Sequence, residues 1–187
     1  MSGKAVDEVI NRAKRMPGVV DAIPLDNKER TKIEELEKEA ESHGAVKGMM
    51  RFVNEGVWEV LKREHLIVVL ADDEQGFRPP PEPWVVICDE NDDKVGEWLP
   101  PEKREKLKGD PSCLFVSDDF VLYKDKYKKG DVYFLMPPIP FPEVEEVEGV
   151  KDVISGTTSA PADIYLKEIL GYTGYNYWTI LVGWNES

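Results

Sequence analysis

Leu66-Ile67-Val68-Val69-Leu70 is an unbroken apolar run that stops at Asp72-Asp73. A short apolar run rich in β-branched residues, without polar alternation, predicts a central strand covered on both faces. The run also marks a change in the chain, because most aromatic residues and prolines follow His65, whereas the first third is rich in Ala, Glu and Lys. We therefore predict one α+β domain over residues 1–187, with a helical part over 1–65 and a β-rich part over 66–187.

Three amphipathic helices are expected before this run. Ala5–Arg15 carries its apolar side chains on one stripe and is followed by Pro17-Gly18. Asp26 and Glu29 form a capping box for a second helix, which is expected to stop at Gly44. Val46–Val60 has apolar residues at alternating steps of four and three, which predicts a third helix.

Short strands separated by proline and by acidic residues are expected after the run. The expected strands are Trp84–Cys88, Leu114–Val116, a hairpin of Phe120–Tyr123 with Asp131–Met136, and Tyr177–Val182. Ser155–Ser159 suggests a loop, and Ser159 is the expected cap of a late helix that ends at Gly171. Glu143–Gly149 alternates acids with valines and suits an exposed edge or a loop. The order predicts N-terminal helices packed on a mixed or mainly antiparallel sheet, with one late helix and a C-terminal strand.

The charge of the chain narrows the classes of partner. A net charge of -13 argues against direct nucleic-acid binding, because affinity for phosphates comes mainly from Lys and Arg. It favours a basic partner or a divalent cation, or it serves solubility alone. The sequence has neither a membrane-length apolar stretch nor a signal-peptide pattern, so a cytoplasmic location is expected. A charged fraction of 33% with a single glutamine is typical of proteins from hot habitats.

Cysteine and histidine are too scarce for the common metal or nucleophile motifs. Cys88 and Cys113 are expected to be reduced thiols, although a bridge between them stays open. His43, His65 and the two cysteines are each more than twenty residues apart, so they lack the close ligand pair of a structural zinc site. His43 is interpreted as a residue at a helix C-terminus and His65 as a structural or surface histidine.

Acidic residues follow three of the expected strands, and this is the sharpest candidate for chemistry. Strands that lie side by side would bring such carboxylates to one edge of a sheet, and converging carboxylates bind Mg²⁺ or Mn²⁺. The alternative is that Asp simply favours the turns in which strands end. The candidate metal ligands are Asp72, Asp73, Asp89, Asp93, Asp118 and Asp119.

Asp89–Asp93 also resembles the start of a calcium-binding loop. Lys94 stands where the EF-hand turn needs glycine and Pro100 where it needs glutamate, so an EF-hand is excluded. A looser Ca²⁺ loop with Glu97 as a further ligand stays open.

Aromatic residues are dense near the C-terminus, and exposed Tyr and Trp are frequent anchors in protein interfaces. The candidate partner-binding residues are Tyr172, Tyr175, Tyr177, Trp178 and Trp184. We therefore expect a non-enzymatic acidic interaction or regulatory module that binds a basic macromolecule or self-associates, without a cofactor. The alternative is a hydrolase that depends on Mg²⁺, Mn²⁺ or Ca²⁺ held by the acidic strand ends.

Overall fold

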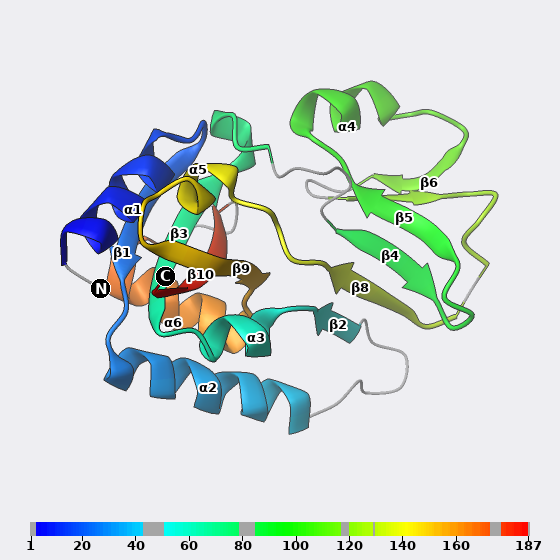
Figure 1. Cartoon of the computed structure of the whole chain (residues 1–187). Coiled ribbons are helices and arrows are strands. Elements are labelled where there is room, and N and C mark those ends of the chain that lie inside the picture. Colours follow the sequence, from blue (N-terminus) through cyan, green and yellow to red (C-terminus); the bar gives the residue numbers. More distant parts are fainter. Residues whose placement is uncertain are drawn as a thin grey trace.

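Two β-sheets form the framework of the protein, and helices pack around them (Figure 1). The computed structural model describes residues 3–42, 51–78, 85–116, 120–128, 130–172 and 177–186. Within these residues the chain forms six α-helices, one short 3-10 helix, a four-stranded sheet and a six-stranded sheet. The predicted α+β class is confirmed, including the early helices, the late helix and the C-terminal strand, although the strands divide between two sheets.

The first sheet is antiparallel and is built around β3 (His65–Asp72). β3 lies between β1 (Val19–Pro24) and β10 (Tyr177–Glu186), and β9 (Val150–Thr157) is the outer neighbour of β10. Every residue of β3 after His65 is buried. The prediction of a central strand covered on both faces is therefore confirmed.

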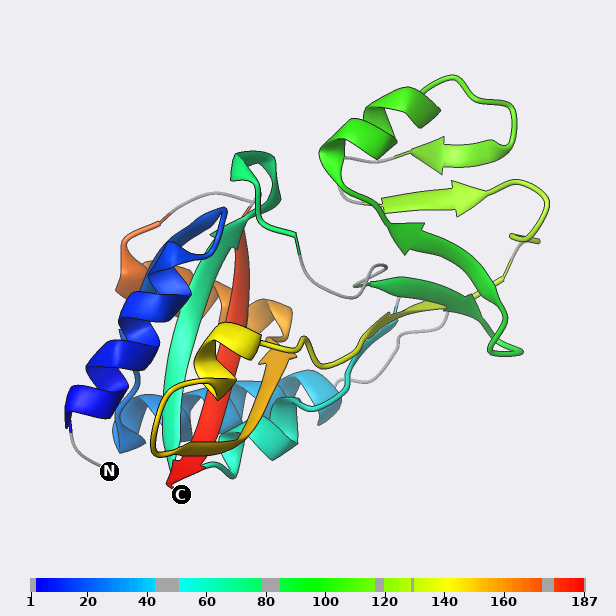
Figure 2. The same cartoon turned by 45° about the horizontal axis from the view of Figure 1, so that its top comes forward.

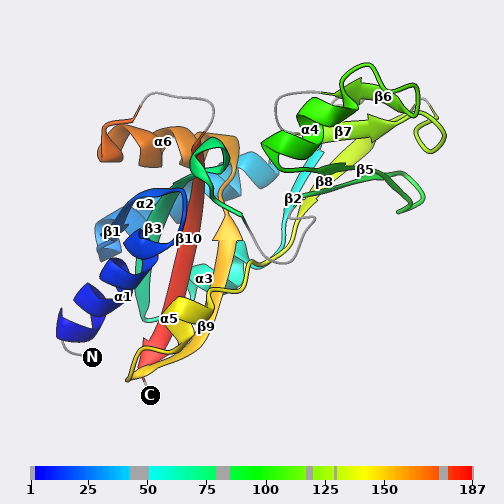
Figure 3. The same ribbon diagram turned by 90° about the horizontal axis from the view of Figure 1, so that it is seen from above.

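β3 is apolar without interruption because its alternate side chains enter two different cores. Ile67 and Val69 belong to one buried cluster, whereas Leu66 and Val68 belong to another. Helices cover both faces of the sheet, as Figures 1 and 3 show from two directions. The first cluster is covered by α1 (Gly3–Arg15) and α5 (Pro142–Glu145), and the second by α2 (Asn27–Ser42), α3 (Val57–Leu61) and α6 (Ala160–Leu170).

The starts of the first two helices follow the sequence pattern. α1 buries Val9 and Ala13 on the predicted stripe. Asp26 precedes α2, and its Oδ1 accepts a hydrogen bond of 2.7 Å from the backbone N–H of Glu29. This is the capping contact that the spacing predicts. The expected stop at Gly44 lies outside the described residues.

The second sheet lies to one side of the first and carries α4 (Figure 2). All its strand pairs are antiparallel except β2 with β8, which run parallel and side by side (Figure 3). Its order is β2 (Arg51–Asn54), β8 (Val132–Met136), β4 (Val86–Asp89), β5 (Lys94–Trp98), β7 (Phe120–Tyr123) and β6 (Cys113–Val116). α4 (Pro101–Leu107) connects β5 to β6.

A buried ion pair joins the two sheets. Asp73 begins η1 (Asp73–Gln75), directly after β3, and its Oδ2 accepts from Arg104 Nη1 and from Trp98 Nε1 at 3.2 Å each. Arg104 belongs to α4, and its side chain is 6% exposed, against 4% for Asp73. Arg104 also donates to the carbonyl oxygen of Leu99. Apolar side chains also pack between the two sheets, since one buried cluster contains residues of both.

The predicted helix over Val46–Val60 is wrong in its middle. Arg51–Asn54 is strand β2, and helix begins only at Val57. Gly56 has φ 89°, which ends any helical path from the preceding residues, and a Cβ there would lie 2.8 Å from Pro138 Cγ. Residues 46 and 50 of the predicted apolar stripe lie outside the described residues.

The predicted hairpin of Phe120–Tyr123 with Asp131–Met136 is also wrong. Both segments are strands, but β7 pairs with β5 and β6, whereas β8 pairs with β4 and β2. The hairpin prediction fails because the sequence pattern does not reveal β5, a short strand that contains one glycine and two charged residues. β4 and β5 therefore occupy the space between β7 and β8.

Several further elements differ from the prediction. The sequence pattern does not indicate β1, β9 or α4. Ser155–Thr157 ends strand β9 instead of forming a loop. Glu143–Gly149 begins within helix α5 and continues as a turn, and Val144 of the helix and Val147 of the turn both lie in the core. None of the described helices is long and apolar enough to cross a membrane.

Glu37→Gln is expected to stabilise the protein at neutral pH. Glu37 on α2 is 3% exposed, and its Oε1 accepts from the backbone N–H of Ser159 at 2.7 Å, before α6. Burial raises the pKa of Glu37 above 4.5, although the hydrogen bond opposes this. Because the folded-state pKa is raised, protonation stabilises the fold, and this stability is lost as pH rises from 4.5 through the folded-state pKa. A neutral glutamine keeps the acceptor and avoids the loss.

Urea unfolding of the wild type and of Glu37→Gln between pH 4 and pH 8 measures this effect. The stability difference should grow with pH and then level off. Glu35→Gln is the control, because Glu35 is exposed on the same helix. A difference between wild type and Glu37→Gln that does not change with pH would contradict the prediction.

Candidate functional site

Asp72 and Asp73, where β3 ends, make hydrogen bonds within the protein that stabilise its fold. Asp72 Oδ1 accepts from the backbone N–H of Glu74 at 3.0 Å, and its Oδ2 accepts from Gln75 Nε2 at 2.8 Å. These contacts make Asp72 the cap of η1. Asp73 is engaged by Trp98 and Arg104. Both carboxylates therefore have partners within the protein.

The acidic loop after β4 is a tight turn. Asp89 Oδ1 accepts from the backbone N–H groups of Asn91 and Asp93, at 2.9 and 3.0 Å. Asp92 adopts a left-handed backbone with φ 64°, and its carboxylate accepts from the Tyr133 hydroxyl at 2.6 Å. That hydrogen bond raises the pKa of Tyr133. The predicted further Ca²⁺ ligand, Glu97, instead accepts from the Tyr123 hydroxyl and pairs with Lys94.

The structure does not bring the described strand-end carboxylates together. Asp72 ends β3 of the first sheet and Asp73 follows it, whereas Asp89 ends β4 of the second sheet and Asp93 lies in the turn before β5. Asp118 and Asp119 lie outside the described residues. Among the described residues, none of these acids is part of a group of three metal-ligand atoms within 4.8 Å. The metal-dependent reading of these positions stays a prediction.

The C-terminal aromatic residues divide between surface and core. Tyr172, after α6, packs edge to face on Tyr177 at the start of β10, with ring centroids 5.6 Å apart. Both are half-buried, as is Trp178. Trp184 is fully buried, so the expectation that it anchors a partner at the surface is wrong. Tyr175 lies outside the described residues.

A surface rich in glutamate lies on and after α5. Val144 and Val147 are buried, and this fixes the turns of backbone between them. Glu143, Glu145, Glu146 and Glu148 are exposed around these two valines, and we call these four residues the acidic ridge. Arg12 of α1 lies beside the ridge, with Nη1 3.4 Å from the carbonyl oxygen of Glu143 and 3.7 Å from the carboxylate of Glu146. One arginine offsets part of the charge of four carboxylates, so the ridge stays acidic.

A group of possible metal ligands that the sequence pattern does not indicate lies elsewhere in the structure. Glu64, His65 and Glu186 place one ligand atom each within 4.8 Å of one another. His65 Nε2 lies 3.5 Å from Glu186 Oε1. Burial lowers the pKa of His65 below its usual 6.5, and Arg30 adds to this effect. The adjacency of Glu64 and His65 was the only signal in the sequence, because Glu186 reaches them through strand register alone.

The two cysteines lie on separate strands of the second sheet. Cys88 is buried on β4 and Cys113 is half-buried on β6. β5 and β7 lie between these strands, and both thiols are free.

The chain matches no protein-family model, and no curated protein or solved structure is significantly similar to it.

Proposed function

We propose that this protein is a non-enzymatic interaction or regulatory module that binds a basic polypeptide through the acidic ridge. The observation that carries the proposal is the construction of the ridge, in which two buried valines hold four exposed glutamates on one short segment. A surface whose backbone is already fixed loses little conformational entropy when it binds a partner. Closely spaced carboxylates also raise the association rate with a positively charged partner.

The placement of the other acids supports a binding role over hydrolysis. A metal-dependent hydrolase needs several carboxylates around one ion and a reacting group. Asp72, Asp73 and Asp89 instead accept hydrogen bonds from neighbouring groups of the protein. The half-buried aromatic pair of Tyr172 and Tyr177 offers a further surface, at which the same module would contact a second protein or a second copy of itself. We further propose that the protein acts in the cytoplasm and does not bind nucleic acid directly.

Titration of a fluorescent lysine- and arginine-rich peptide tests the role of the ridge. The variant Glu143→Gln, Glu145→Gln, Glu148→Gln removes three exposed charges and leaves Glu146 to pair with Arg12. We expect its affinity for the peptide to fall at least about tenfold, equivalent to about 1.4 kcal/mol, and the loss to shrink at high salt.

The matched control is Glu35→Gln, Glu55→Gln, Glu74→Gln, which changes the net charge equally at three exposed residues outside the ridge. Equal loss of affinity in the two triple variants would mean that only overall charge matters, and this would overturn the proposal. Wild-type binding by the ridge variant would overturn it as well. Circular dichroism of both variants verifies that the fold is retained.

A further inference from the structure

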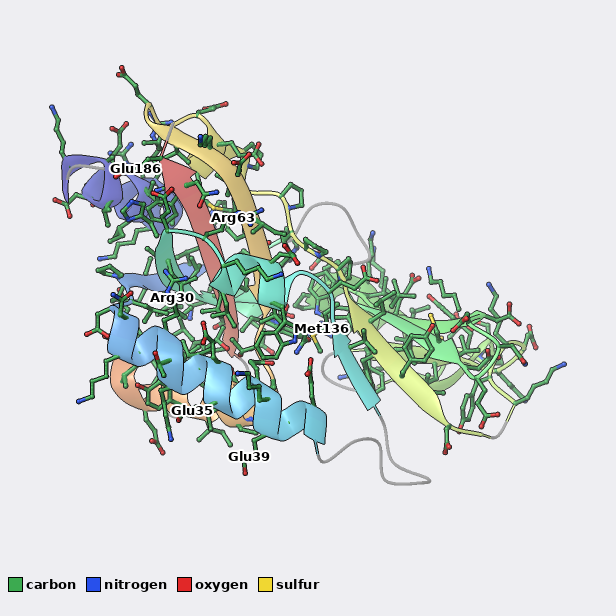
Figure 4. All side chains as sticks on the ribbon, turned by 60° about the horizontal axis from the view of Figure 1, so that its bottom comes forward. Arg30, Glu35, Glu39, Arg63, Met136 and Glu186 are labelled. Atoms are coloured by element: carbon green, nitrogen blue, oxygen red, sulfur yellow. The ribbon has the colours of Figure 1, made fainter. Side chains whose placement is uncertain are left out.

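Glu64, His65 and Glu186 come together because of the register between β3 and β10. Trp184 of β10 pairs directly with His65, the first residue of β3. Side chains alternate along a strand, so Glu186, two residues after Trp184, points to the same face as His65. Glu64 immediately precedes His65. Figure 4 shows Glu186 at the end of β10, the strand drawn in red.

The imidazole of His65 is held in place by stacking. Its ring lies 5.5 Å from that of Trp184, with an interplanar angle of 24°. Trp184 is fully buried in the core, so it provides a rigid support. The orientation of the His65 nitrogen toward Glu186 is therefore set by the fold rather than by a flexible side chain.

The spacing of the first two ligand atoms suits one metal ion. Zn²⁺ binds imidazole nitrogen and carboxylate oxygen at about 2.0–2.2 Å, and two ligands in a tetrahedral site are then about 3.4 Å apart. His65 Nε2 and Glu186 Oε1 are 3.5 Å apart. Glu64 is exposed, and one ligand atom each of Glu64, His65 and Glu186 already lies within 4.8 Å of the other two, so a side-chain rotation brings the Glu64 carboxylate into the same shell.

One ring nitrogen of His65 also lacks a hydrogen-bond partner among the residues that the structure describes. This atom, Nε2, is buried and accepts or donates no hydrogen bond within the described part of the chain, although the Glu186 carboxylate lies 3.5 Å away. A buried nitrogen without a partner is destabilising, and a bound cation would satisfy its lone pair. Arg30 does not fill this role, because its guanidinium donates to the carbonyl oxygens of Leu61 and Glu64.

We propose that Glu64, His65 and Glu186 form a binding site for a first-row divalent transition metal, with Zn²⁺ as the best match. One imidazole and two carboxylates form the mixed nitrogen and oxygen set that Zn²⁺ accepts, and three protein ligands leave a coordination position for water. Mg²⁺ and Ca²⁺ prefer sets made only of oxygen, with six or more ligands. This site is separate from the acidic ridge and does not depend on the proposed function.

Calorimetric titration of chelator-stripped protein with Zn²⁺, and separately with Mg²⁺, tests the site. We expect a single saturable Zn²⁺ site and much weaker Mg²⁺ binding. His65→Phe keeps an aromatic ring against Trp184 and removes the ligand nitrogen, and Glu186→Gln removes the carboxylate. Each is expected to weaken Zn²⁺ binding at least about tenfold.

Two control variants separate this site from general metal binding. His43→Phe removes the only other histidine of the chain, and Glu59→Gln removes an exposed carboxylate on α3. Both should bind Zn²⁺ as the wild type does. Absence of saturable Zn²⁺ binding, Mg²⁺ binding of equal strength, or unchanged Zn²⁺ affinity in His65→Phe and Glu186→Gln would each overturn the proposal. Circular dichroism and thermal unfolding without metal establish that the variants fold.

Discussion

Asp73→Leu is expected to destabilise the protein by about 3–5 kcal/mol, because it leaves the guanidinium of Arg104 buried without its counter-ion. The hydrogen bond from Trp98 Nε1 is lost as well. Because this ion pair joins η1, directly after β3 of the first sheet, to α4 beside the second, the loss should loosen the contact between the two sheets. Urea unfolding, followed by tryptophan fluorescence, measures the change.

The double variant Asp73→Leu, Arg104→Met distinguishes a lost attraction from a stranded charge. If the buried charge causes the damage, removing both partners should recover most of the stability, since well-packed apolar replacements of buried ion pairs are often neutral. Arg104→Met alone should also be strongly destabilising, because it strands the Asp73 carboxylate. If the double variant lost as much unfolding free energy as the sum of the losses in the two single variants, this explanation would be contradicted.

Gly18→Ala is the second substitution with a large expected effect, at least about 4 kcal/mol of destabilisation. Gly18 has φ 78° and lies between α1 and β1, where its carbonyl oxygen accepts from the backbone N–H of Asp72 at 2.8 Å. A Cβ at this position would lie 2.6 Å from both the carbonyl oxygen of Asp72 and the Cα of Phe77. Backbone atoms of β3 and of the following loop would have to move to make room.

Gly109→Ala is the matched control for this prediction. Gly109 has a nearly equal φ of 80°, but no atom of the described residues beyond its chain neighbours lies within 4 Å of its Cβ position. Its substitution should therefore cause only the backbone strain of a left-handed residue, about 1–2 kcal/mol. Thermal and urea unfolding of both variants measure the difference. Similar destabilisation by the two substitutions would show that close packing at Gly18 contributes little.

The elements that the sequence predicts correctly are those with strong local signals. Leu66–Leu70 is uniformly apolar, and Asp26 with Glu29 forms a capping pattern that needs no distant contact. The two main errors involve short segments whose structure depends on distant partners. Arg51–Asn54 becomes a strand because it pairs with β8, about eighty residues later in the chain. Lys94–Trp98 becomes a strand by pairing with β4 and β7.

Prediction of the candidate sites from the sequence is limited in the same way, because each site depends on contacts between distant segments. The acidic strand ends were identified from their order in the sequence, but convergence needs strands of the same sheet that end on the same side. Asp72 and Asp89 belong to different sheets. Glu186 reaches His65 only because Trp184 pairs with His65 in the β3–β10 register. The acidic ridge depends on Val144 and Val147 being anchors rather than surface residues, and alternation alone does not reveal this.

The position of β10 in the first sheet has a consequence for synthesis on the ribosome. β10 is made after every other described strand, yet it pairs with both β3 and β9. Until β10 emerges, the nascent chain holds the apolar β3 with one hydrogen-bonding edge uncovered and both of its cores incomplete. Contacts between residues so distant in the chain form slowly, and exposed strand edges favour aggregation. The interval before β10 is released is therefore the period in which this protein most needs protection by a chaperone.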